Sequence, residues 1–198
     1  MIRLAITGGI GSGKSYVAHQ MTELLGIPVY DSDANAKRLN EESLAIRTGL
    51  MEMVGADVYD AQGRLDKQKL AAFLFASEEN AQRVNSLIHP VVKEDFLRWT
   101  SEQTAPVVAI ETALLAESGI DKIVDKIIRV DAPMEIRISR AMQRDGVTRE
   151  KVLERMALQQ EYPNPDIIIN NVIKIAISMH IYPDAGVSEN YQGRRCLL

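Results

Sequence analysis

A glycine-rich stretch near the start of the chain matches the Walker A pattern G-x-x-x-x-G-K-[S/T] and reads Gly8-Gly9-Ile10-Gly11-Ser12-Gly13-Lys14-Ser15. An apolar run over residues 2–7 precedes it, and a helical pattern over residues 16–25 follows it. A strand is therefore predicted to lead into the loop, and a helix to begin at Lys14 or Ser15. Such a loop presents backbone N–H groups and the positive end of a helix dipole to phosphate oxygens. In this context the full motif predicts a nucleotide phosphate site, and a chance glycine-rich turn is the weaker alternative.

The last two residues of such a loop have separate roles. Lys14 is predicted to reach the β- and γ-phosphates, and the Ser15 hydroxyl is predicted to ligate Mg²⁺. We therefore predict ATP and Mg²⁺ as the ligands. The residues of this segment that we expect at the nucleotide are Gly9, Gly11, Ser12, Gly13, Lys14, Ser15 and Tyr16.

Four further runs are short, apolar and rich in β-branched residues, as the buried strands of a parallel sheet are. They span residues 27–30, 107–110, 126–130 and 167–169, and each is followed by a polar residue, namely Asp31, Glu111, Asp131 and Asn170. Helical patterns lie between them, so the chain consists of repeated β-α units. This alternation predicts an α/β fold with the parallel sheet of a P-loop NTPase, in which ligands bind at the carboxyl ends of the strands.

One interval, from about residue 40 to residue 104, contains no convincing strand pattern. Its apolar residues have helical spacing over residues 43–54, 67–75, 79–88 and 91–102. A helical block inserted between the second and third strands predicts a small subdomain over the crevice, suited to hold a second substrate. The arginine-rich stretch 135–159 predicts two helices joined at residues 145–148, which would close over bound nucleotide as a lid.

Two carboxylates follow the second strand. Transfer of a phosphoryl group to an alcohol benefits from a carboxylate that accepts the hydroxyl proton. In an extended segment Asp31 and Asp33 point to the same side, so one can face the acceptor while the other organises the magnesium shell. The alternative is that Asp31 or Ser32 caps a helix over residues 34–39.

Two further charged groups are candidates for the site. Glu111 ends the third strand, where many phosphate-loop proteins carry an acidic Walker B residue, and it is predicted to hold Mg²⁺ through water. The alternative is a solvated acid at a strand end. Arg140 and Arg144 lie four residues apart, hence on one helical face, from which they can clamp phosphates or stack on adenine. A solvated arginine face is the alternative for this pair.

Histidine offers weaker signals. His89 precedes Pro90, which predicts that a helix ends there with the His89 ring at an exposed corner. A lone histidine in such a place is more often structural than catalytic. No His, Cys and Asp cluster has zinc spacing, and no G-x-S-x-G elbow supports serine-based hydrolysis.

Several strings along the chain resemble those of dephospho-coenzyme A kinases. The likeness runs from Ile2 to about Asn170, with the elements in the order that the family has. The matching strings are the opening at 6–15, the D-x-D element at 30–33, the His-Pro signature at 85–92, the segment at 111–119, the lid string at 140–150, and weaker matches at 63–66 and 73–75. The phosphate loop alone is generic, whereas its combination with the His-Pro and lid strings is specific.

The resemblance implies that ATP phosphorylates the ribose 3′-hydroxyl of dephospho-coenzyme A, giving coenzyme A and ADP in the last step of coenzyme A synthesis. Carried onto this chain, the pattern makes Asp33 the catalytic base, with Asp31 as the second choice. Lys14 and Arg140 would stabilise the transferring phosphoryl group. Arg144 would belong to the nucleotide-facing lid.

The same resemblance places His89 near the acceptor substrate, together with Asp31 and Asp33. The family usually has arginine four residues beyond the second aspartate, whereas this chain has Lys37, with Arg38 beside it. The positive charge is kept, but a lysine cannot form the bidentate contact that an arginine forms. We therefore predict Lys37 as a residue that binds the acceptor.

We interpret residues 1–198 as a single kinase domain of the nucleoside-monophosphate-kinase-like type. Its core is expected at 1–40 and 105–171, an inserted helical substrate subdomain at about 41–104, and the lid at about 135–160. The family closes with an amphipathic helix, but residues 172–198 have no such stripe, because 172–182 is almost wholly apolar and the remainder is loop-like. We interpret this tail as a divergent end or as a reading-frame change.

Composition limits the partners. A net charge of -4 gives no electrostatic case for nucleic acid, and no apolar run is long enough to span a bilayer. The single cysteine, Cys196, excludes an internal disulfide and fits a reducing compartment. We expect a cytoplasmic enzyme that acts on a small molecule, without nucleic-acid or membrane partners, as a monomer or small homo-oligomer.

Three other functions stay open. Another small-molecule kinase, for a nucleoside, a nucleotide or a sugar acid, would share this architecture, although the His89-Pro90 string and the Asp31/Asp33 pair count against it. A GTP-binding switch would need an N/T-K-x-D guanine motif, which the sequence lacks. A nucleotide-binding protein without turnover, made inactive by its altered tail, is the third.

Overall fold

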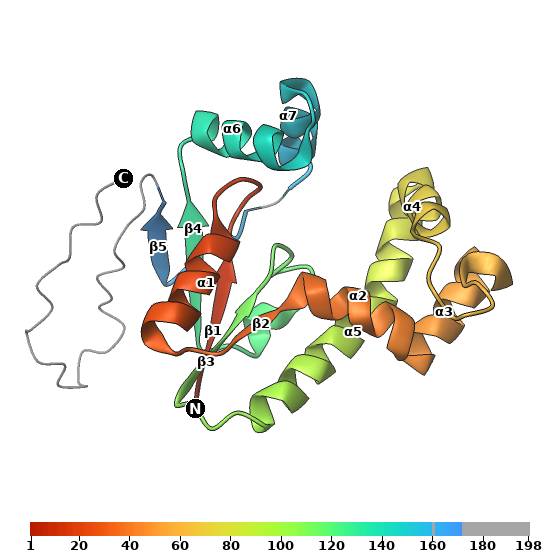
Figure 1. Cartoon of the computed structure of the whole chain (residues 1–198), viewed down its shortest axis with the longest axis horizontal. Helices are drawn as coiled ribbons and strands as arrows, with labels where there is room; N and C mark the ends of the chain where they lie inside the picture. Colours follow the sequence, from red (N-terminus) through yellow and green to blue (C-terminus); the bar gives the residue numbers. More distant parts are fainter. Residues whose placement is uncertain (160, 172–198) are drawn as a thin grey trace, which may run out of the picture.

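A five-stranded parallel sheet forms the centre of the computed structural model, which describes residues 1–159 and 161–171 (Figure 1). Its order is β2-β3-β1-β4-β5, and every neighbouring pair is parallel. The predicted parallel α/β sheet is therefore confirmed, while the predicted tail at 172–198 lies outside the described residues. The strands are β1 (Ile2–Thr7), β2 (Val29–Asp31), β3 (Val107–Glu111), β4 (Lys126–Asp131) and β5 (Ile167–Asn170).

The sheet is covered on both faces, which is why its strands are apolar without a polar side. Leu4 and Ile6 of β1 pack on one face against helix α1 (Lys14–Leu25). Ala5, between them, belongs to the separate core on the opposite face, where the helices of the inserted block pack. The two apolar cores hold β1 from both sides, so the loop that follows it begins from a rigid strand.

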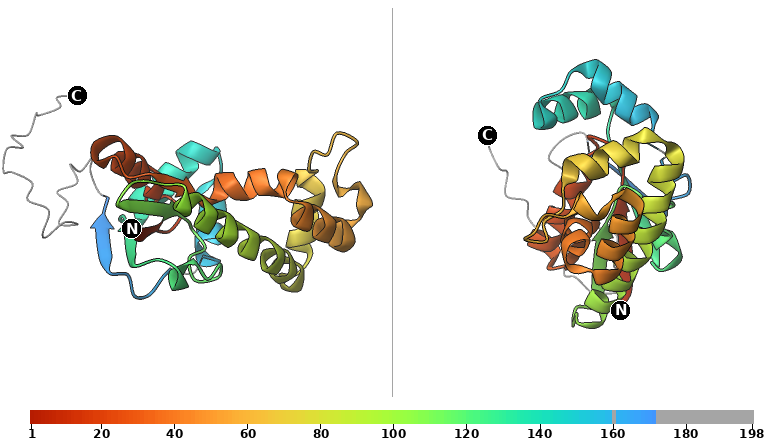
Figure 2. Two further views of the ribbon diagram at one scale, coloured as in Figure 1. Left: turned by 90° about the horizontal axis from the view of Figure 1, so that it is seen from below. Right: turned by 90° about the vertical axis from the view of Figure 1, so that its right-hand side faces the viewer.

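Helices α2 to α5 form an arm that extends away from the sheet (Figures 1 and 2). Serine or aspartate side chains accept a backbone N–H at the N-terminus of each of the four helices, which satisfies groups that the helix itself cannot bond. The helices are α2 (Ser32–Glu42), α3 (Leu44–Val54), α4 (Lys67–Ala76) and α5 (Glu78–Ser101), with a 3₁₀ turn, η1 (Ala56–Val58), after α3.

The prediction that a helix ends at His89 is wrong, because α5 continues through Pro90 for a further 11 residues. Proline removes one backbone hydrogen bond and crowds the preceding turn. The buried side chains Val84, Val92 and Phe96 lie on both sides of Pro90 and share one apolar core. Their packing keeps both halves of α5 on the same surface and outweighs the local preference of the proline.

The predicted lid is a pair of helices, α6 (Met134–Asp145) and α7 (Arg149–Ala157), which lie beyond the carboxyl ends of the strands (Figure 1). Their buried residues Ile138, Ala141 and Val152 form a small apolar cluster against Ile10 of the glycine-rich loop. This pair of helices is thus attached to the loop through a loop side chain. A second 3₁₀ turn, η2 (Ile120–Lys122), precedes β4. Within the described part of the chain, no helix combines the length and the apolar character that crossing a membrane demands.

Candidate active site

The glycine-rich loop connects β1 to α1, and its backbone uses conformations that glycine alone adopts easily. Gly11 and Gly13 have φ angles of 74° and 90°, in the left-handed region. A Cβ atom on Gly13 would lie 2.1 Å from Asn171 Nδ2, and one on Gly11 would lie 2.1 Å from the Arg137 carbonyl oxygen. The loop therefore needs glycine at both positions for its turn and for its neighbours. The predicted helix start at Lys14 is confirmed.

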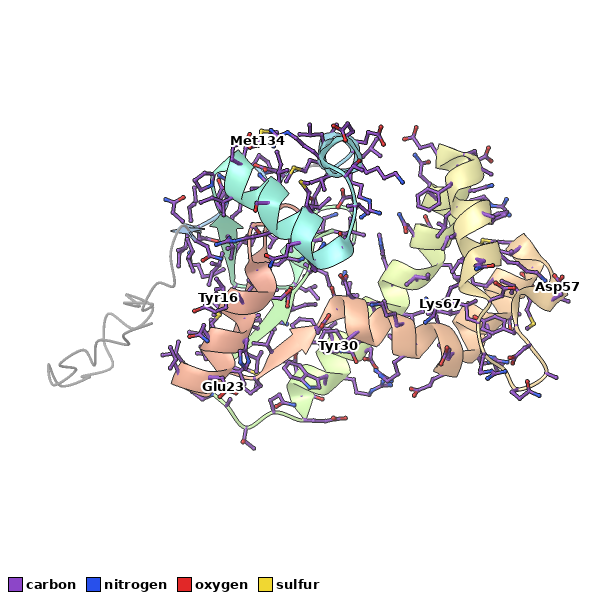
Figure 3. All side chains as sticks on the ribbon, turned by 45° about the horizontal axis from the view of Figure 1, so that its top comes forward. Tyr16, Glu23, Tyr30, Asp57, Lys67 and Met134 are labelled. Atoms are coloured by element: carbon purple, nitrogen blue, oxygen red, sulfur yellow. The ribbon has the colours of Figure 1, made fainter. Side chains whose placement is uncertain are left out.

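Lys14 and Ser15, at the start of α1, converge on one carboxylate of β3. The Ser15 hydroxyl donates a hydrogen bond of 2.5 Å to Glu111 Oε1, and Lys14 Nζ lies 3.8 Å from the same oxygen. This arrangement arises because β1 and β3 are neighbours, with Ile6 in register with Glu111. Tyr16, the remaining residue predicted at the nucleotide, is partly exposed on the first turn of α1 (Figure 3).

Glu111 is buried, with 9% of its surface exposed. Burial raises the pKa of this carboxyl, while the hydrogen bond from Ser15 and the charge of Lys14 lower it. The charges of Asp31 and Asp33 raise the same pKa further, which places both aspartates in the electrostatic field of Glu111. The alternative of a solvated acid at a strand end does not describe this residue.

Asp31 lies beside Glu111 because β2 pairs with β3, with Asp31 in register with Glu111, and Asp33 follows two residues later. The prediction that the two aspartates share an extended segment is wrong, since α2 begins at Ser32. The Asp31 carboxylate accepts a 2.9 Å hydrogen bond from the Ala34 N–H, so Asp31 caps the helix, as the alternative interpretation held. Asp33 is exposed in the first turn of α2.

Arg140 of α6 reaches the glycine-rich loop. Its guanidinium donates to the carbonyl oxygens of Ser12, at 3.3 Å, and of Asn171, at 3.1 Å. Arg144, predicted on the same face, instead forms a two-pronged ion pair with its neighbour Asp145, with hydrogen bonds of 2.7 and 3.0 Å. Of the two predicted lid arginines, only Arg140 touches the loop in this structure.

Three residues that the sequence interpretation did not assign also hold the loop. Arg137 donates from Nε to the Ile10 carbonyl, and its guanidinium lies over Gly9. Gln159 accepts a 2.7 Å hydrogen bond from the Ile10 N–H. The buried Asn171 donates from Nδ2 to the Ser12 carbonyl at 3.0 Å. Arg137 stands in the same arginine-rich stretch as Arg140, but nothing in the sequence singles it out, because its role depends on how α6 is oriented.

One buried polar group of the loop, the Ser12 hydroxyl, is available to bind a ligand. Ser12 is fully buried, and its hydroxyl has no hydrogen-bond partner among the described residues. A buried hydroxyl without a partner is costly, and a ligand oxygen in the loop would remove that cost. This orphaned group supports an oxygen-rich ligand beside the Gly13 turn.

His89 lies on α5, with its Nδ1 atom 3.2 Å from the Glu117 carbonyl oxygen. A carbonyl only accepts, so Nδ1 is the donor in this contact. Burial lowers the pKa of His89, and the Glu117 carbonyl raises it less. The predicted exposed ring is therefore wrong: the residue is partly buried, and its neutral form is favoured.

Lys37 lies one helical turn beyond Asp33 on α2 and lines a cavity of about 380 Å³ between α2 and α4. Its lining combines basic, acidic and apolar side chains. The residues that line it are Lys37, Arg38, Asn40, Glu41, Leu65, Lys67, Leu70, Ala71 and Leu74. A second cavity, of about 410 Å³, lies on the lid and is lined only by residues of α6, α7 and the turn between them.

Comparison with known proteins gives consistent results. The family model for dephospho-CoA kinase matches residues 2–175. A dephospho-CoA kinase of Porphyromonas gingivalis is 48% identical over 160 residues, which cover 81% of this chain and 78% of that protein. A dephospho-CoA kinase of Bacteroides fragilis is 43% identical over 159 residues, covering 80% and 77%.

Two solved structures share the architecture. The protein TT1252 from Thermus thermophilus is 33% identical, with a TM-score of 0.72 over 87% of this chain and 90% of that one. A dephospho-CoA kinase from Campylobacter jejuni is 22% identical, with a TM-score of 0.63 over 88% and 90%. The second likeness concerns the fold alone.

Proposed function

The chain belongs to the dephospho-CoA kinase family, and we propose that it transfers the ATP γ-phosphoryl group with Asp33 as the base that receives the proton of the acceptor. The reaction of the family is the last step of coenzyme A synthesis, in which the ribose 3′-hydroxyl of dephospho-coenzyme A is phosphorylated. The observation that carries the proposal is Glu111, whose carboxylate contacts Lys14 and Ser15 and lies in the electrostatic field of Asp31 and Asp33. Phosphate donor and acceptor base therefore meet at one edge of the sheet.

The glycine-rich loop would bind the nucleotide. Backbone N–H groups of the turn formed by Gly11 and Gly13 would hold the phosphates, with the α1 N-terminus behind them. Lys14 would neutralise charge on the β- and γ-phosphates. Lys14 would turn toward the phosphate from its place 3.8 Å from Glu111 Oε1.

The residues present also fit Mg²⁺. Magnesium in kinases usually takes one or two protein oxygens, with phosphate and water oxygens completing its shell. The Ser15 hydroxyl and the Glu111 carboxylate are 2.5 Å apart and offer this oxygen chemistry. Among the described residues no cluster of three His, Cys, Asp or Glu groups is arranged for a metal, so the phosphates would have to complete the site. When bound, the ion neutralises charge on the β- and γ-phosphates.

Proton transfer would follow from the position of Asp33. Asp31 is committed to capping α2, which leaves the exposed Asp33 one turn from Lys37 as the group able to turn toward the acceptor hydroxyl. A positioned carboxylate that accepts this proton contributes roughly 10²- to 10⁴-fold to the rate. Arg140 would stabilise the charge on the transferring group once its bonds to the loop carbonyls are exchanged for phosphate oxygens.

The arm provides the remaining contacts to the acceptor. Lys37, Arg38 and Lys67, which line the cavity between α2 and α4, would suit the negative diphosphate of dephospho-coenzyme A. His89, neutral and partly buried on α5, would contact the acceptor as a hydrogen-bonding group and not as a charge. Arg144 would reach the nucleotide only after leaving Asp145.

A coupled assay for ADP release tests the function. We expect turnover of ATP with dephospho-coenzyme A, and none with nucleosides, shikimate or gluconate. Turnover with a nucleoside but not with dephospho-coenzyme A would favour the alternative of another small-molecule kinase. ATP binding without turnover on any acceptor would favour a nucleotide-binding protein that has lost catalysis.

A further inference from the structure

Asp95, in the C-terminal half of α5, is a buried carboxylate outside the site described above. Only 5% of its surface is exposed. Tyr30 Oη and Arg38 Nη2 each donate a hydrogen bond of 2.6 Å to its Oδ2 atom, and Arg98 donates to its Oδ1 atom. A buried charge is tolerated only when it is paired and hydrogen-bonded, and both oxygens of Asp95 meet that condition.

The two donors on Oδ2 come from either end of one short segment. Tyr30 immediately precedes Asp31 at the end of β2, and Arg38 lies five residues after Asp33 on α2. A single oxygen atom of α5 therefore holds both ends of residues 30–38. Between these two attachments lie the strand end, the helix cap and the exposed Asp33.

The surroundings make this attachment rigid. Tyr30 is 2% exposed, and its ring packs edge-on against Phe96, with centroids 5.4 Å apart, and against Trp99 at 5.5 Å. Burial and the hydrogen bond to Asp95 raise the pKa of Tyr30, so its phenol remains a donor. Figure 3 places Tyr30 where α2 and α5 leave the sheet.

Arg38 also bonds Asn35 and Glu42, but both of these partners lie on its own helix, α2, whereas Asp95 lies on α5. The Arg38 Nη1 atom donates to Glu42 at 2.7 Å, but the Glu42 side chain is 61% exposed. An exposed pair within one helix contributes little to structure, whereas Asp95 is a buried partner on another helix, so its loss removes the bond between Arg38 and α5. The orientation of α2 on α5 is thus expected to depend on Asp95 and not on Glu42.

We propose that Asp95 is a positioning residue for phosphoryl transfer: its Oδ2 atom holds Tyr30 and Arg38, and so fixes where Asp33 stands relative to the glycine-rich loop. This inference rests on the proposed role of Asp33 as the base. Asp95 touches neither substrate. It acts through the 30–38 segment, and it ties that segment to the helix that carries His89.

The test measures kcat, the KM values and ATP-binding stoichiometry for Asp95→Asn. The asparagine side chain has a single acceptor oxygen and carries no charge. It therefore cannot neutralise Arg38, and we expect the 30–38 segment, and Asp33 with it, to be displaced. A displacement of about 1 Å in a reacting group lowers kcat by up to roughly 10²-fold, and we expect a fall of about 10- to 100-fold. The Kd for ATP should change by less than about twofold, because the glycine-rich loop follows β1, which pairs with β3 and β4 and not with β2.

Four further variants separate positioning from simple loss of stability. Asp95→Glu keeps the charge and should recover part of kcat. Glu42→Gln removes an exposed partner of Arg38, and Arg98→Gln removes a partner of Asp95 that lies on the same helix, α5. In both variants kcat should stay within about twofold of the wild-type value. Tyr30→Phe should lower kcat alone but add little to Asp95→Asn, because both changes break the same contact.

Turnover is divided by the concentration of sites that bind ATP, so that a partly unfolded variant is not mistaken for a slow one. The proposal is supported if Asp95→Asn is slow per binding site while Arg98→Gln is not. It is overturned if Asp95→Asn has wild-type kcat per site, or if Arg98→Gln slows turnover equally. Failure of the base assignment looks different, because Asp33→Asn would then remain active.

Discussion

The two halves of the proposed site differ in how the rest of the protein holds them. On the nucleotide side, the loop between β1 and α1 is held through its own main chain: Arg137, Arg140 and Asn171 all bond its carbonyl oxygens. On the acceptor side, isolated side chains such as Asp33 stand on helices of the arm, which is attached through the buried Asp95 cluster.

This difference predicts how each half tolerates change. The loop binds through its backbone, and therefore depends on the φ angles of its glycines and on the close approach of neighbouring residues. A substitution in the loop should therefore change the affinity for ATP. A side chain on a helix can be removed without moving its neighbours, so substitution there should abolish one chemical step and leave ATP binding intact. The following predictions test this division.

The largest effect is expected from Asp33→Asn. Loss of the base should lower kcat by about 10²- to 10⁴-fold, while the Kd for ATP measured by titration calorimetry stays near the wild-type value. Asp31→Asn is the matched variant: asparagine caps a helix about as well as aspartate, so α2 should stay intact and the loss of kcat should be smaller than for Asp33→Asn. If Asp31→Asn proved the more damaging in kcat, the two roles would have to be exchanged.

The next effect concerns the lid. Arg140→Ala should lower kcat by about 10²- to 10³-fold, because one preorganised cation at the transferring group is lost. Arg144→Ala should cost less than about tenfold, since its guanidinium is paired with Asp145 and mostly exposed. Steady-state ADP release measures both. Equal losses would show that the working lid brings Arg144 to the nucleotide, as the family pattern implies.

A smaller effect is expected from Gly13→Ala, which tests the backbone side. The new Cβ would meet Asn171 at 2.1 Å, and φ of 90° would be strained, so ATP affinity should fall by about tenfold, given a strain of roughly 1–3 kcal/mol. Gly26→Ala is the control, because Gly26 has φ of 63° with nothing within 4 Å of the added Cβ. Unchanged ATP binding by Gly13→Ala would show that the loop is less constrained than its contacts indicate.

The smallest effect is a pH dependence from His89. Burial lowers its pKa below the ordinary value of 6.5, so the unfolded chain takes up the proton first as the pH falls. The contribution of this residue to stability is therefore complete above pH 6.5 and declines below it. His89→Gln should lose less stability than the wild type between about pH 7 and about pH 5 in urea titrations. Parallel losses in both proteins would exclude this role of His89.

The sheet and the loop could be predicted from the sequence because their signals are local. Each strand is a short β-branched run, and the Walker A string fixes its own turn and helix start. The helices of the arm were likewise indicated by apolar spacing. Pro90 misled the prediction, since the tertiary packing of Val84 and Phe96 decides that α5 continues.

The contacts that position the site were not predictable, because they join residues far apart in sequence. Asn171 and Ser12 are 159 positions apart, and Tyr30 and Asp95 are 65 positions apart. Nothing near Asp95 marks it as more than a surface acid on an amphipathic helix. Its burial follows from how α2 and α5 cross, which no local pattern encodes.

The most direct measurement is a crystal structure with dephospho-coenzyme A and a non-hydrolysable ATP analogue. We predict the γ-phosphate between Lys14 Nζ and the ribose 3′-hydroxyl, with an Asp33 oxygen about 2.6–3.2 Å from that hydroxyl. A 3′-hydroxyl bound by another group, with Asp33 turned to solvent, would contradict the meeting of donor and base at the carboxyl edge of the sheet.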